Sequence, residues 1–216
     1  MAAFDLNNNI VRYIETNIIP QYSQFDKAHN ISHIKRVIEN SLEIARLYPV
    51  DINLVYVTAA YHDIGMAKGR KDHEKNSARF LLADKKLEEF FNSDELKIMA
   101  EAIEDHRASI GYEPRSIYGK IVADADNDLE YNSVFRRCLQ YGLATFPEYD
   151  KETHFMRIHE HMIEKYGYDS YLTLWLNTER DQRGLQDIRD MLYKKKEAMR
   201  ADFDKLWKLE GQADAE

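Results

Sequence analysis

The sequence contains few residues that crosslink a chain or interrupt a helix. It has one cysteine, four prolines and eight glycines among 216 residues. The single Cys138 excludes an internal disulfide and any zinc site built on cysteine thiolates. The shortage of proline and glycine leaves long stretches that can fold as uninterrupted helices.

Long apolar runs are also missing. No segment approaches the roughly 20 apolar residues that are needed to span a bilayer. The N-terminal stretch MAAFDLNNNIVRYIE has no basic start followed by an apolar core, which a secretory signal needs. We therefore predict a cytoplasmic protein that has no membrane partner.

The chain has no excess of positive charge. Its 30 lysines and arginines are outnumbered by 38 aspartates and glutamates, which gives a formal net charge of −8. This balance argues against a nucleic-acid polymer as partner, because phosphate backbones attract basic surfaces. A few local cations would still suffice to hold a small phosphorylated substrate.

The residues that are present favour one all-α domain over residues 1–216. Hydrophobic residues make up 44% of the chain, enough to fill a core, and they recur at spacings of three and four. We expect Gly65 to cap the end of one helix and Asp72 the start of the next, and Asn92 with Glu95 to form a capping box. The predicted helices are 4–18, 29–48, 52–64, 73–83, 94–107, 116–129, 130–142, 152–166 and 180–208.

The helix expected at 180–208 carries a single apolar stripe, and its other face is almost entirely charged. The stripe consists of Leu185, Ile188, Leu192, Met199, Phe203 and Leu206. Such a pattern is typical of a helix that covers a core with one face. A contact between two copies of the chain, in a homodimer, is the alternative.

Several histidines and carboxylates fall on faces that the apolar pattern predicts to be buried. His62 and Asp63, in AAYHDIG, close the most apolar helix. His106 and Asp126 continue the apolar stripes of their helices, and His33 lies at the edge of another. Each group could have a hydrogen-bond partner of its own, but burying this many polar groups without a shared partner would cost several kcal/mol. A shared divalent ion such as zinc, iron, manganese or nickel is the other possibility.

Three of these segments resemble the HD-domain metalloprotein superfamily. Its pattern is a histidine on one helix, an HD dipeptide on a later helix and a distant aspartate. His33 in HNISHIKRV, His62-Asp63 in AAYHDIG and Asp126 in KIVADADNDLE match it. The resemblance covers about residues 25–135 and implies a compact helical HD-domain core, with residues 136–216 as a C-terminal helical extension.

Two further histidines resemble the ligands of two-metal HD subfamilies. His73 opens HEKNSARFLL, and His106 lies in IEDHRASIGYEP. With both present, the resemblance implies two divalent metal ions. The implied ligands are His33, His62 and Asp126 for one ion and His73 and His106 for the other, with Asp63 bridging the two.

The sequence departs from each named subfamily. Cyclic-dinucleotide phosphodiesterases have a second histidine where Asp105 stands, and HD nucleotidases have a catalytic glutamate where Met66 stands. Asp124 competes with Asp126 as the aspartate ligand, although helical phase and the motif both favour Asp126. The subfamily therefore stays open.

The resemblance implies a metal-dependent phosphohydrolase that acts on a small phosphate ester or nucleotide. Metal ions bridged by Asp63 would lower the pKa of a bound water, whose hydroxide would attack phosphorus. Arg107 and then Lys120 are the predicted phosphate-binding residues, with Asp63 and Arg107 as the catalytic residues. The alternative for both residues is a solvated surface charge, and for Arg107 also a structural ion pair.

Two other functional classes remain compatible with the same residues. Some HD proteins that share this ligand pattern are di-iron oxygenases, which cleave carbon–carbon or carbon–phosphorus bonds. A metal-stabilised binding module without turnover is the third class. The identity of the metal would separate hydrolysis from oxygenation.

Overall fold

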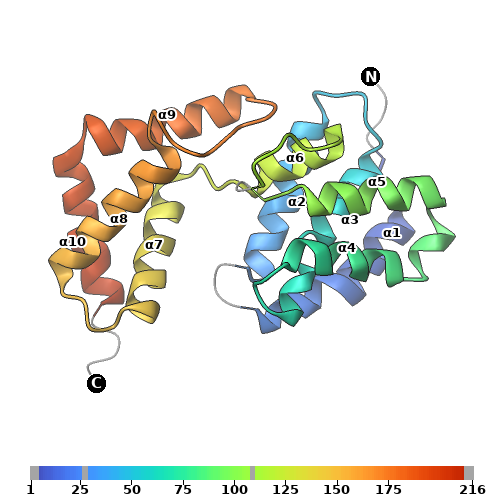
Figure 1. The fold of residues 1–216 in the computed structure, drawn as a ribbon, viewed down its shortest axis with the longest axis horizontal. Coiled ribbons are helices and arrows are strands. Elements are labelled where there is room, and N and C mark those ends of the chain that lie inside the picture. Colours follow the sequence, from blue (N-terminus) through green and yellow to red (C-terminus); the bar gives the residue numbers. More distant parts are fainter. Residues whose placement is uncertain (1–4, 26–28, 108–109, 212–216) are drawn as a thin grey trace. The chain divides into compact units, whose positions relative to one another are not determined.

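Ten α-helices account for most of the part of the chain that the computed structural model describes, residues 5–25, 29–107 and 110–211 (Figure 1). No strand occurs in these ranges, so the all-α prediction is confirmed. None of the described helices combines the length and the apolar character that crossing a membrane requires. The helices are α1 (Asn8–Tyr13), α2 (Ile31–Ala45), α3 (Ile52–Tyr61), α4 (His73–Ala83), α5 (Ser93–Glu104), α6 (Ile117–Asp126), α7 (Tyr131–Thr145), α8 (Lys151–Tyr166), α9 (Glu179–Tyr193) and α10 (Lys196–Glu210).

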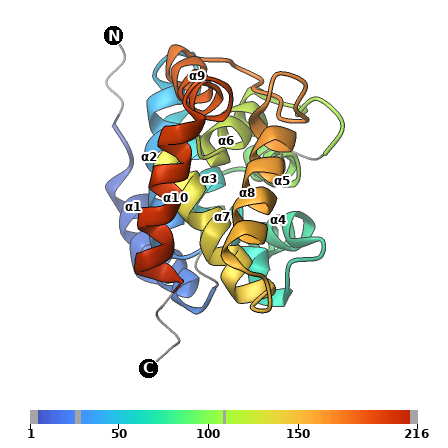
Figure 2. The ribbon, with the colours of Figure 1, turned by 90° about the vertical axis from the view of Figure 1, so that its left-hand side faces the viewer.

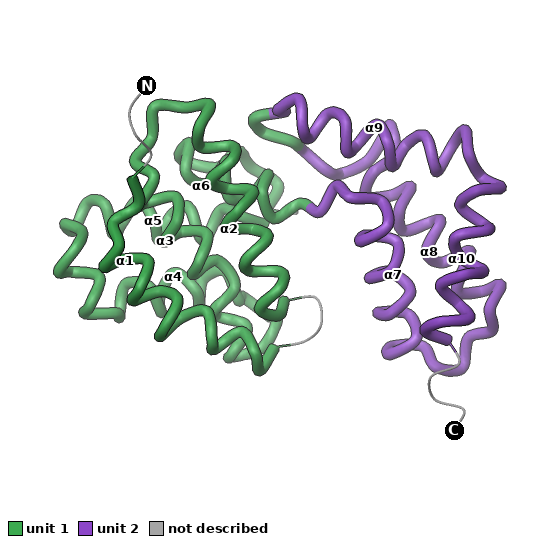
Figure 3. The backbone as a smooth tube through the Cα atoms, turned by 180° about the vertical axis from the view of Figure 1, so that it is seen from behind, with its two compact units in different colours: residues 1–127, 174–176 green, residues 128–173, 177–216 purple. Residues whose placement is uncertain are grey.

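The chain forms two compact units (Figure 3). Unit 1 consists of Met1–Asn127 and Leu174–Leu176, and unit 2 consists of Asp128–Thr173 and Asn177–Glu216. The first border between the two units lies between residues 127 and 128, slightly before residue 135, where the HD-domain core is expected to end. A single domain over residues 1–216 stays a prediction.

Helix α3 is the central helix of unit 1 and contacts α2, α4, α5 and α6. Asp51 caps its N-terminus by accepting a hydrogen bond from the backbone N–H of Asn53, at 2.8 Å. All its residues except Asn53 are buried, because their side chains are apolar or small on every face. A helix that is apolar all round is stable only when other elements surround it.

Helix caps fix where the surrounding helices begin. Asn30 caps α2 by accepting from the N–H groups of Ser32 and His33. Asn92 and Glu95 form the predicted capping box at α5. These caps satisfy N–H groups that no helical carbonyl reaches, which locates the first turn of each helix.

Gly65 does not cap α3, as the sequence led us to expect, because that helix already ends at Tyr61. It lies instead in the 3₁₀ turn Ile64–Lys68 and donates its N–H to Ser77 Oγ at 2.8 Å. A Cβ at this position would lie 2.2 Å from the carbonyl oxygen of His73. Glycine therefore permits α4 to pack directly on the turn that follows the HD dipeptide.

Asp72 occupies the expected N-cap position of α4 but does not cap the helix with its side chain. Asp72 adopts a left-handed backbone conformation, with a φ of 53°, and its side chain caps no N–H group of α4. It accepts instead from Lys75 Nζ at 3.1 Å. Lys75 lies in the first turn of α4, so the carboxylate pairs with a side chain of the helix and not with its backbone.

In unit 2, α7, α8, α9 and α10 pack against one another (Figures 1 and 2). The single helix expected at 180–208 is wrong, because α9 ends at Tyr193 and α10 begins at Lys196. The break at Lys195 lets both helices bury their apolar residues in one core, which includes Ile188 and Met199. A continuous stripe in the sequence is compatible with either arrangement.

Asp84 links three elements of unit 1. Its Oδ2 accepts hydrogen bonds of 2.5 Å from the phenols of both Tyr13 and Tyr61. These residues lie in α1 and α3, and Asp84 ends α4. Burial and the neighbouring carboxylate raise the pKa of Tyr13 to about 12, and the pKa of Tyr61 rises for the same reasons.

We predict that Asp84→Ala lowers the free energy of unfolding by about 2 kcal/mol, because it leaves the Tyr61 phenol buried without an acceptor. Urea denaturation measures the loss. In a Tyr13→Phe/Tyr61→Phe background the same substitution should cost much less, because the two donors are gone. Equal losses in both backgrounds would show that the phenols do not depend on Asp84.

Candidate metal centre

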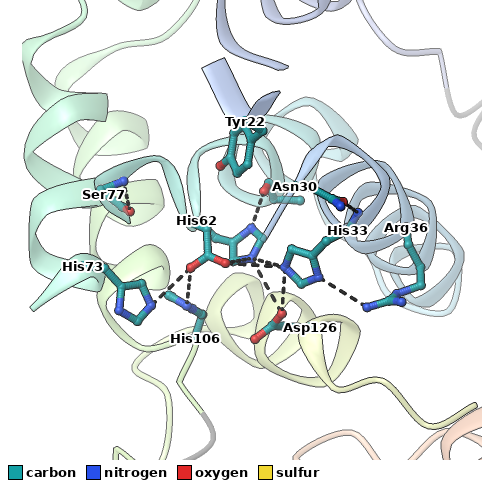
Figure 4. Close-up of polar contacts among 12 residues, drawn as sticks. Tyr22, Asn30, His33, Arg36, His62, His73, Ser77, His106 and Asp126 are labelled. Atoms are coloured by element: carbon teal, nitrogen blue, oxygen red, sulfur yellow. Dashed lines mark hydrogen bonds and ion pairs between the residues drawn. The ribbon is translucent and has the colours of Figure 1, made fainter. Parts of the chain in front are cut away.

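Six predicted ligand side chains meet where five segments of unit 1 converge (Figure 4). Five of them are almost inaccessible to solvent, whereas the Asp126 side chain is 29% exposed. Each comes from the end of an element or just beyond it. They are His33 in the first turn of α2, His62 and Asp63 directly after α3, His73 at the start of α4, His106 shortly after α5, and Asp126 at the end of α6.

The two carboxylate oxygens of Asp63 face different histidines. Oδ2 lies 3.4 Å from His33 Nε2 and 3.2 Å from His62 Nε2. Oδ1 lies 3.2 Å from His73 Nε2 and 3.5 Å from His106 Nε2. This disposition is the one that a carboxylate bridging two metal ions requires.

Asp126 completes the first of these sets. Its Oδ1 lies 3.4 Å from His33 Nε2 and 3.7 Å from His62 Nε2. The potential ligand atoms of His33, His62 and Asp126 lie within 4.8 Å of one another, as do those of His62, Asp63 and His106. His62 therefore lies close to both sets, which the sequence did not indicate.

Asp124, the competing aspartate, has a different environment. Its buried carboxylate accepts hydrogen bonds from the backbone N–H groups of Trp175, at 2.9 Å, and Leu176, at 2.7 Å. It thereby holds the segment Leu174–Leu176 in unit 1. The geometry places Asp126, and not Asp124, beside the histidines.

Backbone carbonyls orient three of the four imidazoles. The Nδ1 atoms of His62, His73 and His106 each face the carbonyl oxygen three residues earlier, at 2.8, 3.1 and 2.6 Å. A carbonyl only accepts, so each Nδ1 carries a proton. In the neutral ring, the Nε2 lone pair is then directed at the carboxylates, which is the arrangement of metal-binding histidines.

The donor set fits a divalent metal ion. Asp63 Oδ1 is buried and has no hydrogen-bond partner among the described residues. This oxygen faces the Nε2 atoms of His73 and His106. In the neutral rings these nitrogens are also hydrogen-bond acceptors, so a cation or a proton must lie between them and the oxygen. Nitrogen and carboxylate oxygen are ligands for iron, manganese, nickel or zinc.

The buried charges show the same need for a cation. Burial alone would raise the pKa of Asp63, but the surrounding histidines hold it well below its usual value. Burial would lower the pKa of His62, but Asp63 and Asp126 raise it well above the usual value. The pKa of His73 rises for a related reason, chiefly its contact with Asp63. Protons therefore compete with a metal for these nitrogens.

A pocket of about 240 Å³ is lined in part by Glu74 and Arg107, which directly follow His73 and His106 in the sequence. Arg107 Nη1 lies 3.5 Å from Glu74 Oε2, which in turn lies 3.5 Å from His73 Nδ1. Glu74 was not predicted from the sequence to contribute to the site, although it directly follows His73, a predicted ligand. The pocket is lined by Glu74, Lys75, Glu104, Arg107, Ile110 and Tyr112.

Asp105 anchors the segment after His106. Its fully buried carboxylate accepts from the backbone N–H of Arg115 at 2.8 Å and from the Tyr112 hydroxyl at 3.0 Å, and it also binds the Arg115 guanidinium. The residue that departs from the phosphodiesterase pattern thus has a structural partner. Lys120, the second predicted phosphate-binding residue, forms an ion pair with Glu113.

We predict that metal stabilisation increases with pH. In chelator-treated protein, the raised pKa values of His62 and His73 give stability that is present below about pH 6.5 and lost as pH rises through them. A metal needs the deprotonated rings, so its binding releases protons. The increase in melting temperature caused by Mn²⁺ should therefore be larger at about pH 8.5 than at about pH 6. A larger increase at the lower pH would contradict this account.

Comparisons with known proteins agree with this architecture. Residues 30–129, which contain all six residues, match the family model described as HD domain. A crystal structure of a predicted HD superfamily hydrolase from an uncultured Thermotogales bacterium is similar in fold, with a TM-score of 0.54 and 23% identity. The likeness covers 89% of this chain and 92% of that one. No curated protein matched the chain. Residues 30–129 of this chain therefore match an HD domain.

Proposed function

We propose that the protein is a metal-dependent phosphohydrolase that acts on a small phosphate ester or nucleotide. The observation that carries the proposal is the convergence of buried acceptors around Asp63, whose Oδ1 has no hydrogen-bond partner among the described residues. The HD-domain match supports the same class of reaction. Membership of the family alone does not select the substrate.

His33, His62 and Asp126 would hold one divalent ion and His73 and His106 the other, with Asp63 between them. When bound, such ions supply Lewis acidity, which lowers the pKa of water and offsets charge on phosphoryl oxygens. The buried residues hold the ligands in place before any substrate arrives. The partly exposed Asp126 marks the side on which water and substrate reach the centre.

Arg107 is our first candidate for binding the phosphoryl group. Its side chain is 43% exposed and lines the pocket of about 240 Å³. The contact of its Nη1 with Glu74 Oε2 is long, at 3.5 Å. A guanidinium binds phosphate through paired N–H groups. Lys120 is the second candidate, although its pairing with Glu113 offsets its charge.

We predict that Arg107→Ala lowers kcat/KM for a hydrolysed phosphate ester about tenfold or more, because a phosphate contact is lost. Metal content and melting temperature should change little. Arg79→Ala is the matched control, since Arg79 is exposed on α4 and, among the described residues, donates a hydrogen bond to Asn76. A large drop in melting temperature for Arg107→Ala would assign Arg107 to a structural ion pair instead.

The two-ion arrangement depends most on His73. We predict that His73→Ala reduces bound metal from about two ions per chain to about one, because the remaining residues still form a complete nitrogen and oxygen set. Elemental analysis of wild type and variant, purified without chelator, measures this. Equal stoichiometry in the two proteins would leave a mononuclear centre.

The same elemental analysis tests the proposed reaction class. Iron together with a visible absorbance and no phosphatase activity would favour the di-iron oxygenase, since imidazole and carboxylate also suit iron. Full metal occupancy without any turnover would favour a binding module. Hydrolysis of phosphate esters that stops on chelation and returns with Mn²⁺ would support the proposal.

A further inference from the structure

His33 differs from the other three histidines of the centre in the partner of its Nδ1 atom. That atom lies 3.3 Å from Nη2 of Arg36, whereas the other three Nδ1 atoms face carbonyl oxygens. Figure 4 shows the guanidinium of Arg36 on the side of the His33 ring that faces away from His62. A carbonyl only accepts hydrogen bonds, and a guanidinium only donates them.

This contact determines which nitrogen of His33 carries the proton. Because Arg36 can only donate, Nδ1 of His33 must accept, and the proton of the neutral ring then lies on Nε2. Nε2 faces Asp63 and Asp126, each at 3.4 Å, and His62 Nε2 at 3.3 Å. A proton thus occupies the position from which His33 would donate a lone pair to a metal.

The backbone of α2 imposes the contact. Asn30 caps the helix and accepts from the N–H of His33 at 3.2 Å, which fixes the first turn. Arg36 lies three residues later and therefore on the same face of the helix. Val37, which follows it, is fully buried and holds this part of α2 against the core.

We propose that Arg36 is a positioning residue that opposes metal binding by His33, so that the two metal positions have unequal affinities. The position formed by His33, His62 and Asp126 is the weaker one. Ligation by His33 requires its Nε2 to lose a proton to solvent and its Nδ1 to gain one, and the contact with Arg36 must then break. This inference rests on the metal centre proposed above but not on the hydrolytic reaction.

Substitutions of Arg36 separate the hydrogen-bond effect from the charge effect. Arg36→Gln places an amide oxygen that can accept from Nδ1–H, Arg36→Met removes the charge without supplying an acceptor, and Arg36→Lys keeps a donor-only cation. Arg46→Gln is the control on the same helix, because Arg46 is exposed at the end of α2. Circular dichroism verifies that each variant is folded.

Titration with Mn²⁺, followed by the electron paramagnetic resonance signal of the free ion, measures the two affinities. We expect two dissociation constants for the wild type, of which the larger belongs to the position that includes His33. In Arg36→Gln this larger constant should be about tenfold or more lower than in Arg36→Met. Arg36→Lys and Arg46→Gln should resemble the wild type. Equal affinities in the Gln, Met and Lys variants, or no binding of Mn²⁺ at all, would overturn the proposal.

Nitrogen-15 NMR of the wild type tests the same inference without a variant. In chelator-treated protein, His33 should show an unprotonated Nδ1, whereas the other three rings of the centre should carry a proton there. Addition of Zn²⁺ should move the His33 proton to Nδ1. A protonated Nδ1 of His33 before metal is added would contradict the proposal. Both measurements are independent of turnover, so an inactive protein that gives these results would refute only the proposed reaction.

Discussion

The convergence of four buried imidazoles on the carboxylate of Asp63 is the constraint on which the candidate centre depends. The surrounding helices are apolar where they pack, and they bring their polar groups together at their ends. Helix α3 is apolar on every side and is therefore fixed by its neighbours, which also fixes His62 and Asp63 at its end. Tyr22 adds a further restraint, because its hydroxyl donates to the carbonyl oxygen of Ala60 at 2.9 Å. The core thus determines where the ligands meet.

The features that follow the helical period could be predicted from the sequence. The apolar stripes placed His106 and Asp126 on buried faces, and both are at the centre. The capping box of Asn92 and Glu95 was visible for the same reason, because it depends on residues within one turn. Local spacing therefore gave the all-α fold and placed most of the converging side chains on buried faces, whereas His73 was selected only through the resemblance to two-metal HD subfamilies. Their roles as ligands stay predictions.

Features set by contacts between elements could not be predicted in this way. Arg36 looks like an ordinary surface residue of an amphipathic helix, and only the placement of the His33 ring gives it a partner in the centre. Asp72 is a common capping residue type, and its left-handed conformation without a side-chain cap was not visible in the local sequence. The break at Lys195 leaves the apolar stripe unchanged and has no glycine or proline to mark it. Periodicity reports which face is buried, but not what it is buried against.

The segment Leu174–Leu176 makes the border of unit 1 discontinuous along the sequence. The N–H groups of Trp175 and Leu176 satisfy the buried carboxylate of Asp124, two residues before Asp126. A chain shortened to residue 127 would contain every predicted ligand and yet lose both of these donors, which removes two hydrogen bonds from a buried carboxylate close to the centre. Unit 1 is therefore continuous in space but not along the sequence, so no single truncation of the chain reproduces it.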